Sequence, residues 1–404
     1  MTAAIVAGIP VPAGGTPPIA PEDRAIAYLV REVPRWSTEN GCFSCHNNGD
    51  GARALYDFKR RSGAVPAGAL ADTTRWLEHP ERWEHNKGDP RFSDMGLARI
   101  QFTAALAAAT DAGLVRDTRA VNRAAHRLAD DQREDGSWAV DAAGNIGSPT
   151  TYGTRLATLI ARRTLHRADP ERFGPAVAKA DRWLRSRPIH TLVDAAVALL
   201  ETGRREDTDA RRRQATALAL IRRGQSRDGG WGPFVTAPPE TFDTALVVLA
   251  LSEIADSSEV HTMRRRGRSF LIRRQLPDGG WPETTRPTGA DSYAQRMSTT
   301  AWAARALLAT QGDSSHSTSP RGTGKDKRMG TQPNRTSTER RVDSETGMGR
   351  HCAAPRHKRL CACSAGRPRR WIGDRLGDVC RRPRTLTREI AGATPSLDIY
   401  PATV

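Results

Sequence analysis

The stretch Gln225-Ser-Arg-Asp-Gly-Gly-Trp231 decides the fold of this chain, because it returns 50 residues later as Gln275-Leu-Pro-Asp-Gly-Gly-Trp281. A third copy, Gln132-Arg-Glu-Asp-Gly-Ser-Trp138, lies earlier in the chain. Glycine adopts positive φ at little cost, so each copy predicts the end of a helix and a reversal of the chain. Tryptophan adds a large apolar ring with one N–H donor, and glutamine an amide that can bond backbone groups at neighbouring helix ends. We therefore expect the Gln and Trp residues of all three copies to be structural and to join helices.

A fixed period of this length is typical of repeat proteins. At about 50 residues per repeat, residues 22–310 accommodate about six pairs of helices. The second helix of each pair is apolar on most of its faces, which predicts burial. These second helices are expected at residues 52–60, 97–109, 152–165, 192–201, 243–254 and 299–310. First helices such as 25–33, 177–186 and 266–274 are amphipathic, with arginine on the outer face.

The three heptapeptides resemble the QW motif of the squalene and oxidosqualene cyclases and their prenyltransferase relatives. The resemblance covers residues 22–310 and is strongest over 205–310. It implies an all-α fold, an α/α toroid of about six helix pairs. It also implies a hollow centre that binds an apolar or isoprenoid ligand.

The same resemblance locates the place of a catalytic acid. Cyclases of this family protonate an alkene with the middle Asp of an Asp-x-Asp-Asp-Thr-Ala motif, and the closest match here is Glu240-Thr-Phe-Asp243-Thr-Ala245. Phe242 occupies the position of the proton donor. Asp243 and Glu240 are therefore catalytic candidates only for a divergent terpenoid cyclase, an isomerase or transferase, and Asp243 is alternatively a helix N-cap. Prenyltransferases hold zinc with a Cys in the later repeats, where this chain has none.

A second polar cluster lies in the last loop of the repeat region. Carboxylate, guanidinium and phenol groups that converge on a concave surface can form a binding site. The candidates at the mouth of the cavity are Glu283, Arg286, Tyr293 and Arg296. Ordinary surface ion pairs are the alternative interpretation of the same residues.

Cys42-Phe-Ser-Cys45-His46 is a Cys-x-x-Cys-His motif, which is typical of c-type haem attachment. Two thiols at this spacing can add to the vinyl groups of haem, and the adjacent imidazole can ligate its iron. The segment around it resembles the attachment site of small bacterial c-type cytochromes over about a dozen residues. A redox disulfide, a zinc site and two ordinary buried thiols remain alternatives.

A haem at this motif needs a sixth ligand or leaves one position of the iron open. Met95 is the first candidate for this ligand, with His79 and His85 as alternatives. Haem c is attached outside the cytoplasm, so its presence predicts a periplasmic or other extracytoplasmic location and a redox partner. Without it, a cytoplasmic location is expected.

Charge and composition describe the two ends of the chain. Residues 1–21 are rich in Pro and Gly and are predicted to be disordered. Residues 311–404 hold 19 Lys and Arg against 9 Asp and Glu, which is +10 of the total +17, and predict a disordered basic tail. An extension read out of frame would have the same composition. The tail lacks regular basic and aromatic interleaving, so no specific nucleic-acid binding is expected, and no stretch is apolar enough for a transmembrane segment.

These observations lead to one functional hypothesis and one alternative. The hypothesis is a toroidal scaffold that binds a ligand or carries a haem for electron transfer, without the usual cyclase acid. The alternative is a divergent terpenoid cyclase or a related enzyme that processes polyprenyl substrates.

Overall fold

The computed structural model describes residues 19–62, 64–86, 94–140, 146–284, 286 and 292–314. The twelve α-helices all belong to one compact unit, which ends at Asp313 in the described part of the chain. A second unit, Ser314–Ile372, lies outside the described residues after its first residue. The predicted disordered ends, 1–21 and 311–404, also lie outside the described residues except at their inner margins.

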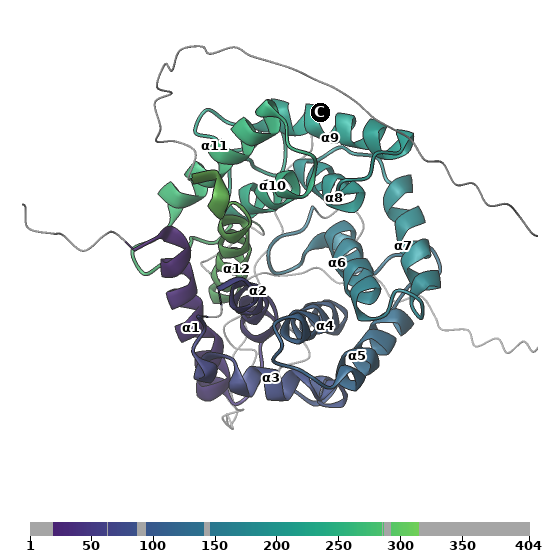
Figure 1. Ribbon diagram of the computed structural model, residues 1–404, viewed down its shortest axis with the longest axis vertical. Coiled ribbons are helices and arrows are strands. Elements are labelled where there is room, and N and C mark those ends of the chain that lie inside the picture. Colours follow the sequence, from purple (N-terminus) through teal and green to yellow (C-terminus); the bar gives the residue numbers. More distant parts are fainter. Residues whose placement is uncertain are drawn as a thin grey trace, which may run out of the picture. The chain divides into compact units, whose positions relative to one another are not determined.

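The described residues contain twelve α-helices and no strand, so the all-α prediction is confirmed. Outer helices alternate with inner ones along the chain (Figure 1). The outer helices are α1 (Pro21–Asn40), α3 (Ala71–Leu77), α5 (Thr118–Asp130), α7 (Gly174–Ser186), α9 (Thr208–Gly224) and α11 (Ser258–Arg274). The inner helices are α2 (Ala52–Ser62), α4 (Met95–Asp111), α6 (Gly153–Ala168), α8 (Leu192–Thr202), α10 (Thr241–Glu253) and α12 (Tyr293–Ala309).

The inner helices form a closed ring. Each one contacts the next from α2 through α12, and α12 contacts α2 again. Figure 1 shows these six helices around the centre and the outer six outside them. The six pairs of the predicted α/α toroid are therefore present, and each predicted second helix corresponds to an inner helix. Four short helices complete the path: η1 (Cys45–Gly51), which is a π-helix, and the 3₁₀ turns η2 (Ala67–Ala69), η3 (Pro80–His85) and η4 (Gln311–Ser314).

The three heptapeptides make the same contacts at equivalent places. Each indole is buried, and its Nε1 donates to a carbonyl ten residues earlier in the preceding outer helix: Leu128, Ile221 and Leu271, at 2.7–2.8 Å. The backbone N–H of each tryptophan donates to a threonine of the following inner helix, Thr158, Thr244 or Thr300. Each copy thus fastens one outer helix to the inner helix of its own pair.

The glutamine of each copy reaches the next outer helix in the ring. The amide of Gln132 donates to Ala176 O at 2.9 Å, and the amide of Gln225 to Met263 O at 3.0 Å. The third copy joins the last repeat to the first, because Gln275 Nε2 donates to Pro21 O at 2.9 Å. A buried ion pair between Arg268 of α11 and Glu22 of α1 supports the same closure. No helix in the described part of the chain is both long and apolar enough to cross a membrane.

Candidate functional site

The π-helix η1 brings polar side chains of the first repeat into the ring. Ser44 caps it, since its Oγ accepts from the backbone N–H groups of His46 and Asn47. A Cβ on Gly51 would meet the end of the Met297 side chain of α12 and would lie 3.0 Å from Val33 Cγ2 of α1, so glycine leaves room for this segment between the two helices. π-helical turns occur often at functional sites, and this one carries Asp50 into the protein interior.

Asp50 lies at the centre of a polar cluster that joins four repeats. It is only 3% exposed and accepts from three side chains of three other repeats. Oδ1 accepts from the Tyr152 hydroxyl, and Oδ2 accepts from Gln101 Nε2 and from Ser298 Oγ, both at 2.8 Å. Burial raises the pKa of the Asp50 carboxyl, and these three hydrogen bonds oppose that increase.

Tyr152, which donates to Asp50, has a backbone conformation in the left-handed region of φ. Its φ of 61° makes it the one non-glycine residue with positive φ among those described. Such a conformation costs about 1–3 kcal/mol and persists only where the surroundings enforce it. Burial and the neighbouring Asp50 charge raise the pKa of the Tyr152 phenol, so it is a hydrogen-bond donor at neutral pH.

His46 extends this cluster through Ser298. Its Nδ1 lies 3.0 Å from Ser298 Oγ, and burial lowers the pKa of the imidazole to about 4, so the ring is neutral near pH 7. The Ser298 hydroxyl donates its proton to Asp50, so it must accept from His46 Nδ1–H. This tautomer leaves His46 Nε2 unprotonated and able to accept a proton or bind a ligand.

Asp243, a predicted catalytic candidate, forms a bidentate ion pair with Arg286. It is 1% exposed, and its two carboxylate oxygens are 2.9 and 3.0 Å from the two terminal nitrogens of Arg286. Burial raises the pKa of Asp243 to about 6 against the lowering effect of Arg286. Asp243 lies in the first turn of α10 and not at its N-cap, which is Glu240, so the N-cap interpretation was wrong. Glu240 Oε2 is 3.5 Å from the same guanidinium.

Phe242, at the position of the family's proton donor, is buried. Its ring packs edge-on against Trp302 of α12, with the two ring centroids 5.8 Å apart. The Tyr152 ring also packs edge-on against Trp302, with centroids 5.7 Å apart. This position therefore contributes to an aromatic core between α10, α12 and the start of α6.

The predicted cavity-mouth residues fall into separate environments. Arg286 turns inward to Asp243, whereas Arg296 pairs with Asp278 at 2.6 Å and lies over the Tyr28 ring. The Tyr293 hydroxyl accepts from Asn47 at 2.8 Å and donates to Glu32 at 3.1 Å, and its ring stacks on Trp36. Glu283 is half-buried. Within the described residues, Arg286, Tyr293 and Arg296 make no hydrogen bond or ion pair with one another, so they do not form one converging set.

The Cys-x-x-Cys-His segment packs against the ring. Cys42 is 2% exposed, and Cys45 carries a free thiol, so these two cysteines are not bonded to each other as the redox-disulfide alternative required. Burial, with help from the Asp50 and Asp94 carboxylates, raises the pKa of the Cys45 thiol to about 12. Met95, the first residue of α4, directly follows that Asp94. Within the described residues, no three His, Cys, Asp or Glu side chains gather as a zinc site would require.

The other candidates for a sixth haem ligand lie in η3 and just before it. His79 Nδ1 is 3.0 Å from Glu81 Oε1, and His85 is exposed. The four cysteines of the tail, Cys352, Cys361, Cys363 and Cys380, lie outside the described residues.

Comparison with known proteins supports the family resemblance. Residues 190–351 match the family described as the squalene-hopene cyclase C-terminal domain. The chain is 30% identical over 105 residues to lanosterol synthase ERG7 of Saccharomyces cerevisiae, a stretch that covers 25% of this chain and 14% of that enzyme.

Solved structures similar to the chain share low sequence identity with it. The type II terpene cyclase MstE from Scytonema has 14% identity and a TM-score of 0.46, over 72% of this chain and 99% of that chain. A protein from Actinoplanes has 16% identity and a TM-score of 0.49, over 72% and 99%. The ent-copalyl diphosphate synthase from Streptomyces platensis has 18% identity and a TM-score of 0.40, over 72% and 50%. Over residues 190–351, therefore, the chain is squalene cyclase-like in sequence, and the helices α8 to α12 within this stretch form part of an α/α toroid.

Proposed function

We propose that this chain is a squalene cyclase-like ligand-binding protein whose ring binds an apolar, isoprenoid-type molecule without cyclising it. The observation that carries this proposal is that no free carboxylic acid stands where cyclases of the family have their proton donor. Phe242 replaces the proton donor and packs into the core, and Asp243 is neutralised by a two-pronged contact with Arg286. A carboxylate paired in this way is a poor source of the proton that an alkene requires.

One observation favours a second function, that of a divergent cyclase. Asp50 is a buried carboxyl group with a raised pKa, held by side chains from α4, from α12 and from the start of α6. Enzymes tune catalytic acids by such burial. If the chain is an enzyme, Asp50 is therefore a better candidate for its acid than Asp243 or Glu240.

Incubation of the purified chain with squalene and with geranylgeraniol tests both functions. We expect each lipid to be retained by the folded protein and recovered unchanged, as measured by extraction and gas chromatography with mass spectrometry. Heat-denatured protein is the control for nonspecific retention. No retention overturns the binding function. A cyclised product that disappears in Asp50→Asn and persists in Asp243→Asn supports the divergent cyclase instead.

A covalent haem is a separate proposal for the first repeat. Two features of the donor set support it: Cys45 is a free thiol, and Ser298 fixes His46 Nδ1 so that Nε2 can serve as a ligand. Cys45 would hold the group by a thioether bond, and so would Cys42 once the disulfide bond that it forms in this structure is reduced. His46 would bind the iron, and Met95 is the candidate for a further ligand. When bound, haem would supply a one-electron redox centre for electron transfer with a partner.

Intact mass spectrometry tests this proposal on chain that is coexpressed with a haem maturation system. We expect a mass increase of one haem per chain and visible haem absorbance. Both signals should be lost in the Cys42→Ala/Cys45→Ala variant, whereas a Cys361→Ala/Cys363→Ala variant is the matched control in the tail. An unmodified mass for the parent chain would exclude the haem.

A further inference from the structure

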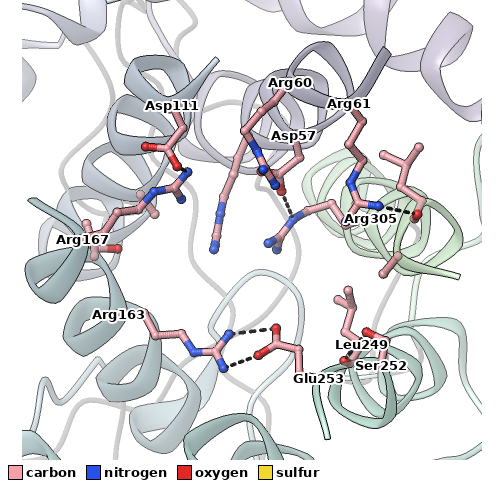
Figure 2. A pocket seen from close by; sticks show the side chains of 15 residues that line it. Asp57, Arg60, Arg61, Asp111, Arg163, Arg167, Leu249, Ser252, Glu253 and Arg305 are labelled. Atoms are coloured by element: carbon pink, nitrogen blue, oxygen red, sulfur yellow. Dashed lines mark hydrogen bonds and ion pairs between the residues drawn. The ribbon is translucent and has the colours of Figure 1, made fainter. Parts of the chain in front are cut away.

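A charged cavity of about 490 Å³ opens where the inner helices end. Its lining comes from the C-terminal halves of α4, α6, α10 and α12 and from most of the length of α2. Figure 2 shows its charged side chains facing one another from these helices. The volume lies within the usual range of ligand sites, about 300–1,000 Å³.

The cavity holds twice as many cations as anions. Its lining includes six arginines and three carboxylates. Each carboxylate is already paired with one arginine: Asp57 with Arg305, Asp111 with Arg167, and Glu253 with Arg163 (Figure 2). The three remaining arginines are Arg53, Arg60 and Arg61, all on α2, so the cavity has three cations in excess.

Helix geometry accounts for only part of this excess. The C-terminus of a helix carries about half a negative charge, and arginine side chains commonly bind its free carbonyls. Arg61 does so, since it donates to Leu308 O at 2.8 Å. Arg53 and Arg60 make no hydrogen bond or ion pair with any residue in the described part of the chain, and Arg53 Nη1 is buried without a partner.

A buried guanidinium nitrogen without a hydrogen-bond partner, such as Arg53 Nη1, is costly. Burial, with the nearby Arg305 charge, lowers the pKa of Arg53 to about 10, against the opposing effects of Asp57, Tyr152 and Asp50. Arg60 and Arg61 are exposed at the end of α2, while Arg53 lies two turns deeper on the same helix. An anion that enters from the ends of these helices would meet the exposed pair first and Arg53 below it.

We propose that this cavity binds a diphosphate group. Guanidinium groups recognise phosphoryl oxygens through two parallel hydrogen bonds, and two linked phosphoryl groups offer oxygens to several arginines at once. A single carboxylate would neutralise one of the three excess charges. This inference does not rest on the proposed function of the ring, because it concerns the charges that line this cavity and not the acid position at Phe242 and Asp243. Arg60 and Arg61 lie at the C-terminal end of α2, whereas Arg53 lies at its start and also interacts with Asp50.

Isothermal titration of the full chain with inorganic pyrophosphate tests the proposal. We expect saturable binding that weakens with added salt and is at least about tenfold tighter than binding of orthophosphate. In Arg53→Gln/Arg60→Gln, affinity should fall by about tenfold to a hundredfold, the usual range for two charge-assisted hydrogen bonds. The matched control is Arg211→Gln/Arg212→Gln on the exposed face of α9, which removes the same charge and should change affinity less than about twofold.

Two outcomes would overturn the proposal: no binding by the parent chain, or an equal loss in the control variant, which would mean nonspecific attraction to a basic protein. If circular dichroism shows that the double variant does not fold, the affinity of the single variant Arg60→Gln for pyrophosphate tests the proposal instead. Arg60 is exposed, so this substitution should leave the fold intact. A third titration with methyl diphosphate separates the two sources of the ligand. Tighter binding of the ester assigns the cavity to the head group of a larger molecule, and equal or weaker binding assigns it to free diphosphate.

Discussion

Replacing Gly279 by alanine is expected to lower the free energy of unfolding by more than about 3 kcal/mol. Gly279 has a φ of 93°, and a Cβ at this position would lie 2.2 Å from the carbonyl oxygen of Arg24. That oxygen belongs to the backbone of α1, so it cannot rotate away as a side chain would. The substitution therefore has to push the last repeat away from the first, at the place where Gln275 holds Pro21. Urea denaturation followed by circular dichroism measures the change.

Gly113→Ala is the matched control for this experiment. Gly113 also has positive φ, at 72°, but a Cβ there would have no neighbour within 4 Å. Its substitution should cost only the backbone strain, about 1–2 kcal/mol. Equal losses in the two variants would mean that strain alone acts, and the close approach of the two repeats would then have no energetic importance.

Removing Arg286 is expected to have the second large effect, a loss of about 3–5 kcal/mol of stability at pH 8. Arg286→Ala leaves the Asp243 carboxylate buried without its partner. The double variant Asp243→Asn/Arg286→Ala should recover much of the loss, because it removes the buried charge as well. If the double variant is as unstable as Arg286→Ala, the loss comes from packing and not from the unpaired charge.

The dependence of this effect on pH has a definite sign. The pKa of Asp243 is raised to about 6 in the folded chain, above that of an unfolded aspartate near 3.8. The folded state therefore holds this proton more tightly, and its contribution to stability is full below about pH 4 and lost as the pH rises through about 6. The parent chain should lose about 2–3 kcal/mol of stability over that interval relative to Asp243→Asn. Urea denaturation at pH 4.5 and 8 measures it, and parallel curves for the two proteins would contradict the raised pKa.

The inner helices and the toroid could be predicted from the sequence because their signals are local. Predicted segment 192–201 became α8, Leu192–Thr202, and predicted segment 243–254 became α10, Thr241–Glu253. Apolar residues on all faces of a short segment report burial wherever the segment lies. The last inner helix begins at Tyr293, several residues before the predicted start at 299, because Ser292 caps it.

The Asp50 cluster could not be predicted in the same way. Its three donors are 51, 102 and 248 residues away in the sequence, and the register of the ring decides which side chains meet. The one local signal was Gly49-Asp50-Gly51, whose glycines permit close approach to α4 and α12. The arginine cavity also depends on closure, since α2, α6 and α12 supply its cations from different parts of the chain.

The joining of the first repeat to the last has a consequence for how the protein matures. During synthesis the N-terminal helices leave the ribosome first, but Ser298 and the Gln275 amide that complete their contacts emerge more than 200 residues later. Until then, α1 and the π-helix expose polar groups and apolar faces that have no partner. The centre of the ring therefore cannot be assembled progressively, and a nascent chain stalled before α12 would lack both its closure and its Asp50 cluster.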